Sequence, residues 1–319
     1  MKNYLIILLS LFFVCCNSKS EREQEIDKIP IDLAIQRFDL ELGTAIESDL
    51  PHLKNKYPAF FPEQFPDSVW VAQLTDTLQI ELNDEVAKKY PDTDLFEDDL
   101  KGLFQHIKYY FSEFQSPQVI TLTSYVDYQN KVIVANDTVL IALDTYLGSD
   151  HKFYEGIQKY ISKNMNSSQI IPDVATAYAE RFISFPKQKT LLSQMIFYGK
   201  QLYLKNLWLP NYTDAEKIGY TEEEIIWAKN NEIDIWRYFV QNEILYSTDP
   251  KLPSRFITPA PFTKFYLEID NESPGMIGRY LGWQIVRSYM EKNDVGIKQL
   301  MMLDAETIFN ESKYKPKKT

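Results

Sequence analysis

The sequence predicts an α+β fold that is mostly helical, with a small three-stranded antiparallel meander packed against many helices. Three short β-rich runs, at residues 119–125, 131–135 and 138–143, are separated by turn residues and predict the meander. Most other segments place apolar residues three or four positions apart, which is the spacing of an amphipathic helix. The chain has 319 residues, of which 45% are hydrophobic, and no linker divides it. We therefore expect a single globular domain.

The elements before and within the meander follow from local patterns. Ile31, Leu33 and Ile35 alternate with other residues, which predicts a first strand. Residues 42–90 have a mixed, mostly helical pattern that several prolines interrupt. The clearest amphipathic helix covers residues 96–114 and ends before Pro117. Turns at residues 127–130 and 136–137 would connect the three strands of the meander.

The chain beyond Tyr146 is predicted to be almost entirely helical. Thr221 and Glu224 form a capping box, and Ser273 and Asp304 are suitable N-cap residues. Helices are expected over residues 173–183 and 189–207, from the capping box through Tyr246, from Ser273 to Lys292, and after Asp304.

Residues 1–16 have the features of a lipoprotein signal peptide. Lys2 supplies a positive start, and residues 4–14 form an apolar run that is too short to span a membrane. We expect cleavage after Cys15 and lipidation of Cys16, because Val14 is a bulky residue to precede a lipidated cysteine. An ordinary cleaved secretory signal is the alternative.

These features divide the chain into four parts. Residues 1–15 are a signal peptide that is removed, and residues 16–28 are a lipidated cysteine with a charged, flexible tether. Residues 29–312 form the globular domain, and residues 313–319 are a basic tail. An acyl chain on Cys16 would hold the domain at a membrane surface. We expect it to face the periplasm, with the outer membrane favoured over the inner.

Composition and motifs exclude several classes of function. The formal net charge of −11 argues against nucleic acid as a partner. Both cysteines lie at the signal junction, and His52, His106 and His151 are isolated in sequence, so we expect no metal and no cofactor. The acidic residues 92–99 lack the glycine and glutamate of a calcium-binding loop. No nucleophile elbow, P-loop or dinucleotide-binding glycine pattern is present, so no catalytic residue is predicted.

One late segment mixes polar and aromatic side chains on a single helical face. Within residues 231–246, this face would carry Glu232, Trp236, Phe239 and Glu243. Such a face is typical of a partly buried polar network or of a contact surface. The candidate polar or contact cluster that we predict consists of Tyr198, Glu232, Arg237, Glu243 and Arg279.

A second late segment, residues 273–289, combines glycines with arginines. Gly275, Gly278 and Gly282 form a stripe of small residues, which predicts close helix packing because interior glycines otherwise weaken a helix. Arg279 and Arg287 are two turns apart and share a face. They are expected to pair with buried carboxylates such as those of Glu232 and Glu243.

Several motifs resemble the gliding motility lipoprotein GldB family of Bacteroidota. They are RFD at residues 37–39, KIGYT at 217–221, IWRYF at 235–239, LYSTD at 245–249, RFI at 255–257, APFTKFY at 260–266, IDNESPG at 269–275 and IGRYLGW at 277–283. The resemblance implies a lipid-anchored component required for gliding motility, which is linked to protein secretion across the outer membrane. It implies no catalytic residues.

The order of elements is also similar, more distantly, to that of gluzincin-type zinc metallopeptidases. In this comparison residues 191–199 stand where those enzymes carry a His-Glu-x-x-His helix. Gln194, Met195 and Tyr198 would replace the histidines and the general base, and Glu232 would be the remaining third ligand position. This resemblance implies a degenerate zincin-like scaffold that has lost its metal ligands.

Taken together, these features predict a non-enzymatic accessory protein of the gliding apparatus. It would bind the membrane through its lipid and other gliding or secretion envelope proteins through its helical surface. A cell-envelope hydrolase acting on peptide or glycan and a pseudo-metallopeptidase binding module are the alternatives. A glycan-binding module rests only on the aromatic content.

Overall fold

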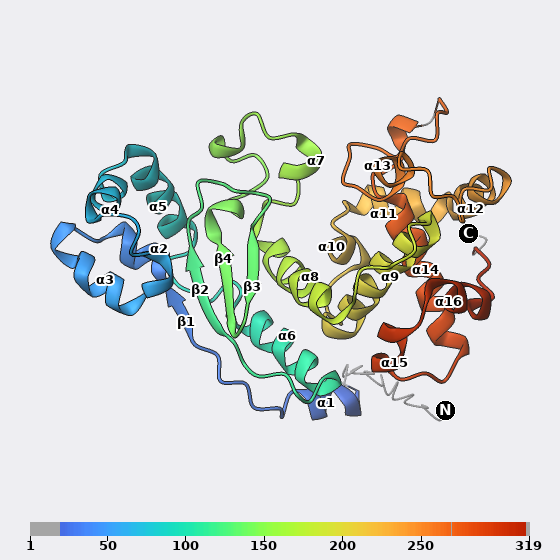
Figure 1. The fold of residues 1–319 in the computed structure, drawn as a ribbon, viewed down its shortest axis with the longest axis horizontal. Coiled ribbons are helices and arrows are strands. Elements are labelled where there is room, and N and C mark those ends of the chain that lie inside the picture. Colours follow the sequence, from blue (N-terminus) through green and yellow to red (C-terminus); the bar gives the residue numbers. More distant parts are fainter. Residues whose placement is uncertain (1–19, 269, 317–319) are drawn as a thin grey trace, which may run out of the picture.

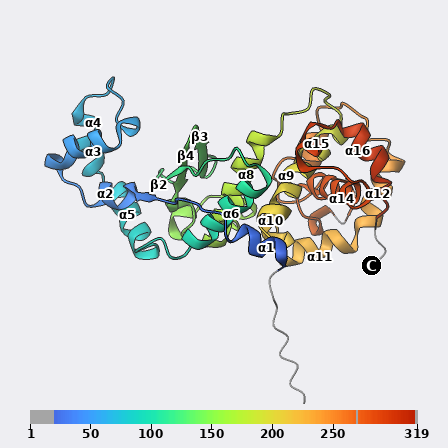
Figure 2. The same cartoon turned by 90° about the horizontal axis from the view of Figure 1, so that it is seen from below.

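The computed structural model describes residues 20–268 and 270–316. In this part of the chain, α-helices surround one four-stranded sheet, which confirms the mostly helical α+β class (Figure 1). The helices of residues 38–89 lie on one side of the sheet, and most of the other helices extend away from its other side (Figure 2). Across these residues, no helix combines the length and apolar character needed to cross a bilayer.

The sheet is mixed and has the spatial order β1-β2-β4-β3. Its strands are β1 (Ile35–Arg37), β2 (Gln118–Leu122), β3 (Val132–Ala135) and β4 (Thr138–Ala142). β2 runs parallel to both β1 and β4, with Val119 opposite Ile35 and Val139. Only β3 and β4 form an antiparallel hairpin, in which Val134 faces Val139.

The predicted three-stranded meander is therefore wrong, although its three strands and the β3–β4 hairpin exist. The cause is the buried carboxylate of Asp144, just beyond the end of β4. It accepts hydrogen bonds from the backbone N–H groups of Ser124 (2.9 Å) and Val126 (2.7 Å). Tyr125 and Val126 have positive φ angles, so the chain turns sharply after β2. It then passes β4 and returns as the edge strand β3 instead of folding back beside β2.

Helices cover both faces of the sheet. On one face, Ile120 packs with Phe38 and Leu42 in a small core under the first helices. These helices are α2 (Phe38–Gly43), α3 (Leu50–Lys56), α4 (Asp67–Leu74) and α5 (Thr77–Lys89). On the other face, Val119 and Val139 belong to a larger core that contains α6 (Glu97–Tyr110) and α8 (Ile170–Phe182). The short helix α7 (Lys159–Ser162) precedes α8.

The C-terminal half is built on two long helices, α9 (Leu191–Trp208) and α14 (Ile277–Lys292). A Cβ atom on Gly282 would overlap the carbonyl oxygen of Met195, and one on Gly199 would overlap the backbone of Gly282. The two backbones are thus in direct contact, which confirms the close packing predicted from the glycine stripe. The surrounding helices are α10 (Asp214–Ile218), α11 (Glu222–Asn230), α12 (Glu232–Gln241), α13 (Leu252–Phe256), α15 (Ile297–Met302) and α16 (Ala305–Ser312).

Two predicted helices have different bounds in the structure. The helix expected from the Thr221 capping box to Tyr246 is divided at Asn231, whose side-chain amide donates to the carbonyl of Trp227 (2.9 Å). The helix expected from Ser273 begins at Ile277 instead. The hydroxyl of Ser273 bonds to backbone carbonyls of the preceding loop, so Ser273 does not act as the N-cap.

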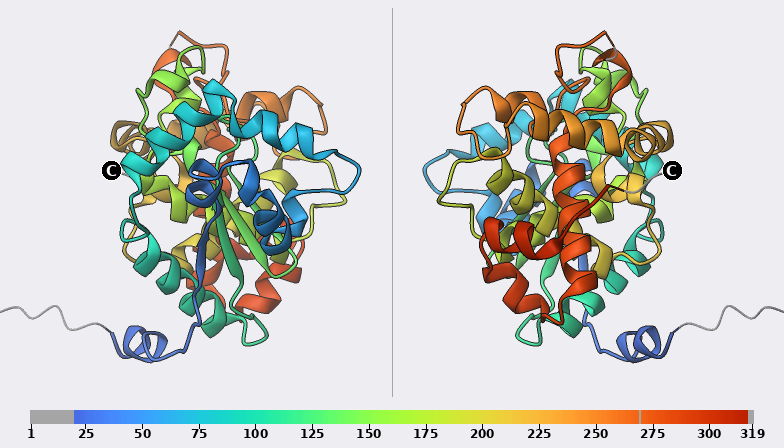
Figure 3. Two further views of the ribbon diagram at one scale, coloured as in Figure 1. Left: turned by 90° about the vertical axis from the view of Figure 1, so that its left-hand side faces the viewer. Right: turned by 90° about the vertical axis from the view of Figure 1, so that its right-hand side faces the viewer.

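Both predicted ends of the domain are longer than expected. Residues 21–26 form helix α1 (Glu21–Ile26), which packs along α6 (Figure 3), so this part of the expected flexible tether is folded. Ile26 is buried, and the side-chain amide of Gln105 donates to the carbonyls of Asp27 and Ile29, each at 3.0 Å. At the other end, Tyr314 of the predicted basic tail packs against the domain. Cys16 lies outside the described residues.

Candidate functional site

The five predicted cluster residues do not form one site. Glu232, at the start of α12, is buried. The hydroxyl of Tyr280 donates to one of its carboxylate oxygens (2.7 Å), and the hydroxyl of Tyr314 donates to the other (2.8 Å). Burial and the neighbouring carboxylate raise the pKa of both tyrosines, so both remain hydrogen-bond donors at neutral pH. This arrangement fastens the C-terminal segment to α12 and α14.

Two of the predicted cluster residues, Tyr198 and Arg279, lie together in the structure. The guanidinium of Arg279 lies 4.0 Å from the centre of the Tyr198 ring, and its Nε donates to the carbonyl of Ile257 (2.7 Å). Arg237 is exposed and pairs with Asp234 three residues earlier (2.5 Å). Glu243 is exposed at a turn with positive φ beyond the end of α12. Arg237 and Glu243 therefore belong neither to the group of Glu232 and its two tyrosines nor to the pair of Tyr198 and Arg279.

The expected pairing of the α14 arginines with Glu232 or Glu243 is also wrong. Arg287 instead binds both carboxylate oxygens of Asp214, at 2.7 and 2.9 Å, and donates to Asn206 (2.8 Å). Its guanidinium also lies 3.8 Å from the centre of the Trp283 ring. Arg287 thereby joins α14 to α9 and α10 as a structural ion pair.

A buried polar group that the sequence did not suggest lies between the sheet, α8 and α9. The ammonium of Lys205 is buried and donates to the hydroxyl of Thr176 (3.0 Å). Burial lowers the pKa of Lys205 to about 7. Nearby, Asp173 accepts hydrogen bonds from Lys131 and from the hydroxyl of Tyr146 (2.9 Å).

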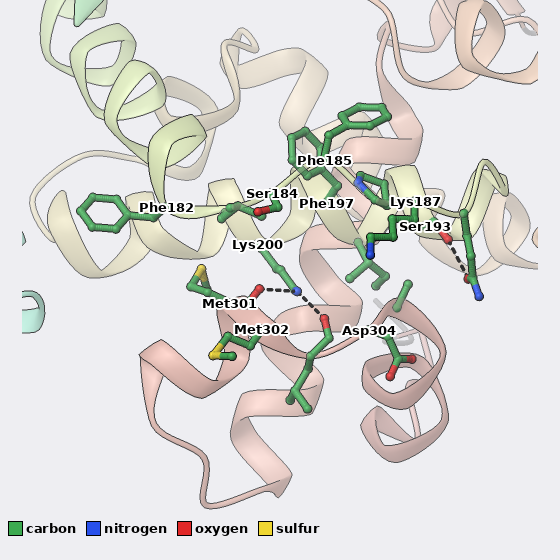
Figure 4. Close-up of a pocket in the computed structure, with 16 residues that line it drawn as sticks. Phe182, Ser184, Phe185, Lys187, Ser193, Phe197, Lys200, Met301, Met302 and Asp304 are labelled. Atoms are coloured by element: carbon green, nitrogen blue, oxygen red, sulfur yellow. Dashed lines mark hydrogen bonds between the residues drawn. The ribbon is translucent and has the colours of Figure 1, made fainter. Parts of the chain in front are cut away.

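A groove of about 510 Å³ lies at the surface of the C-terminal half (Figure 4). One wall consists of residues 182–188, at and after the end of α8, and the other consists of residues 301–305, from the end of α15 to the start of α16. Its volume is in the range of roughly 300–1,000 Å³ that is usual for ligand pockets. The apolar lining consists of Phe182, Ile183, Phe185, Pro186, Ile196, Phe197, Met301, Met302, Leu303 and Ala305.

Large apolar side chains remain exposed along this groove. Phe185 is 63% exposed and Met302 is 88% exposed. The ring of Phe185 packs edge-on against that of Phe197, with 5.0 Å between the ring centres. Exposed apolar side chains gathered around a groove are typical of a protein-binding surface.

The floor of the groove is shaped by Lys200 of α9. Its buried ammonium donates to the backbone carbonyls of Met301 (3.1 Å) and Leu303 (2.6 Å), as the dashed lines in Figure 4 show. Burial lowers the pKa of Lys200 to about 8, and Asp304 partly opposes this shift. The ammonium is thus committed to holding the end of α15 against α9.

The structure places the metallopeptidase-like segment in a packed helix interface. Met195 is buried and contacts α14 through its own backbone, and Gln194 is half-buried. Within residues 20–268 and 270–316, no group of three or more His, Cys, Asp or Glu side chains is arranged to hold a metal ion.

The comparisons with known proteins identify one family. None of the curated proteins and none of the solved structures matches the chain, so the distant likeness to gluzincin-type metallopeptidases stays a prediction. Residues 19–316 match the family described as gliding motility protein GldB. The match covers nearly the whole chain and confirms the resemblance found in the sequence motifs. The chain therefore belongs to the family of gliding motility protein GldB.

Proposed function

We propose that this protein is a lipid-anchored, non-enzymatic accessory component of the gliding motility apparatus. Lipid on Cys16 would hold it at the periplasmic face of a membrane, with the outer membrane favoured. It would act by binding other gliding or secretion proteins of the envelope. The observation that carries this proposal is the apolar groove with Phe185 and Met302 exposed at its rim.

The chemistry of the groove favours binding over catalysis. Its lining is mainly aromatic and aliphatic, and its buried ammonium, Lys200, is already engaged by two carbonyls. A general acid–base site requires a titratable group within hydrogen-bond reach of a substrate. By contrast, partner proteins commonly insert large apolar side chains into such pockets, where a few contacts supply most of the binding free energy.

The experiment is membrane fractionation and in-place chemical cross-linking of the intact protein beside two cysteine variants. The Cys16→Ala variant should fold but leave the membrane fraction, lose its cross-links to envelope proteins and fail to restore motility. The Cys15→Ala variant is the matched control, because it retains Cys16 and should behave like the unaltered protein. If Cys16→Ala restores motility in full, or if the membrane-inserted protein cross-links to no envelope protein, the proposal is refuted.

A further inference from the structure

One wall of the groove carries positive charge in a protein that is otherwise acidic. Residues 181–190 contain Arg181, Lys187 and Lys189 but no acidic residue, whereas the whole chain has a net charge of −11. Lys187 lines the groove (Figure 4), and Lys189 follows two residues later. Both lysines are exposed and have no ion pair to any residue in the described ranges. Arg181 donates to the carbonyl of Val134 at 3.2 Å. Two cations on this wall are therefore available to a partner.

The same wall also has unused backbone hydrogen-bonding groups. Between the end of α8 and Thr190, which caps α9, residues 184–189 belong to no helix or strand. Their N–H and C=O groups make no hydrogen bond within the described part of the chain. Each residue other than Pro186 thus has one donor and one acceptor that the main chain of a peptide could engage. An extended peptide can bind such an edge through its own main chain.

The opposite wall contributes one carboxylate near the groove. Asp304 is the N-cap of α16, and its carboxylate accepts from the backbone N–H and the hydroxyl of Thr307, each at 2.8 Å. These bonds hold the carboxylate at the start of α16. The cations without an ion pair in the described ranges are Lys187, which lines the groove, and Lys189, two residues farther along the same segment.

We propose that the groove binds an extended, acidic peptide segment of a partner protein that carries large apolar side chains. This inference rests on the proposed protein-binding function and specifies the chemistry of the partner. An apolar side chain of the segment would enter between Phe197 and Met301. Its carboxylates would pair with Lys187 and Lys189, and its main chain would bond to residues 184–189. A fatty acyl chain fits the groove less well than a peptide, because it would leave the main-chain groups of this wall without hydrogen-bond partners.

A random ten-residue peptide library, displayed on phage and selected on the immobilised Cys16→Ala chain, tests the inference. The enriched peptides should combine aspartate or glutamate with leucine, isoleucine or phenylalanine. Fluorescence anisotropy of an enriched peptide should show affinity about tenfold weaker for the Lys187→Glu/Lys189→Glu variant. The Met302→Glu variant should weaken binding in the same way, since it adds a like charge at an exposed rim position. The Lys88→Glu/Lys89→Glu variant, with the same charge change on α5, should bind as the unaltered chain does.

A charge swap provides a second readout that does not depend on loss of binding. The enriched peptide with its acidic residues replaced by lysine should bind the Lys187→Glu/Lys189→Glu variant better than it binds the unaltered chain. Unfolding temperatures of all variants should agree, because the altered residues are exposed.

Four outcomes would overturn the inference. The first two are a selection that enriches no peptide family and one that enriches peptides without acidic residues. The third is that the groove variants bind the peptide as tightly as the unaltered chain does. The fourth is that oleate at equal concentration displaces the peptide and binds more tightly than the peptide does. Recovery of envelope proteins by in-place cross-linking together with any of these outcomes would refute the groove inference alone. Loss of those cross-links would refute the proposed function itself.

Discussion

Replacing Lys205 by methionine should make the protein more stable at neutral pH. Lys205 lies in α9 with 5% of its surface exposed, and among the described residues its ammonium has one hydrogen-bond partner, the hydroxyl of Thr176. Burial is the largest cause of the fall in its pKa from 10.5 to about 7; Asp173 opposes this fall, and Lys131, Arg279 and Lys217 add to it. Methionine fills a similar volume without a charge. Thr176 keeps a partner, because its hydroxyl also donates to the carbonyl of Pro172 (2.9 Å).

The magnitude follows from proton linkage. Between pH 7 and pH 10.5 the unfolded lysine is protonated and the folded one is largely neutral, so stability rises with pH across this window. This gain in unfolding free energy is complete above pH 10.5 and is lost as the pH falls toward 7. Each pH unit corresponds to about 1.4 kcal/mol. From pH 7 to pH 9, the unaltered protein should therefore gain roughly 2 kcal/mol of unfolding free energy that Lys205→Met does not gain.

The assay is urea unfolding at pH 7, 8 and 9, followed by tryptophan fluorescence. Lys200 also has a lowered pKa, but it is present in both proteins and cancels in the comparison. Lys89→Met, at an exposed position of α5, is the control and should change neither stability nor its pH dependence. If Lys205 were charged and paired in the fold, its removal would cost roughly 3–5 kcal/mol at pH 7. A destabilised Lys205→Met, or one with the pH dependence of the unaltered protein, would refute the reasoning.

Three further pairs of variants test the packing and capping by thermal unfolding. Gly282→Ala should lower stability by roughly 1–3 kcal/mol because its methyl would overlap α9, whereas Gly102→Ala, which meets nothing in α6, should raise stability by up to about 1 kcal/mol. Tyr314→Phe should cost roughly 1–3 kcal/mol by removing a donor from the buried Glu232, and an equal result for the exposed Tyr246→Phe would contradict this. Thr221→Ala should cost about 1 kcal/mol through loss of the α11 cap, and Thr221→Ser should restore it.

The helices were largely predictable because their signals are local. The apolar spacing of residues 96–114 identified α6, and the capping box at Thr221 and the N-cap Asp304 are both present in the structure. The order of the strands was not predictable in this way. It depends on Asp144, whose two backbone partners are 18 and 20 residues earlier in the chain. No short-range pattern reports such a contact.

Of the candidate site, the sequence could predict only the part that the contact between α9 and α14 determines. Gly199 and Gly282 allow α9 and α14 to touch, and this contact brings Tyr198 beneath Arg279. The partner of Glu232 in the C-terminal segment, Tyr314, is 82 residues away and lies in a stretch that looked like a solvated tail. The groove is formed by two loops that meet only in the folded chain. Its one sequence signal was the run of residues 181–190, which combines aromatic and basic residues without an acid.

The folding of α1 changes how far the domain can lie from a membrane that holds Cys16. The helix begins at Glu21, so five residue steps separate it from Cys16, and a fully extended chain of this length spans at most about 18 Å. Inserting ten Gly/Ser residues after Ser20 raises this limit to about 54 Å. Energy transfer from a dye on Glu25→Cys to an acceptor in vesicles carrying the lipidated protein should therefore fall, since lipidated Cys16 cannot take the dye. The same insertion after Thr319 should leave the transfer unchanged. Equal transfer with both insertions would mean that the domain is held at the bilayer by its own surface and not by the short connection to Cys16.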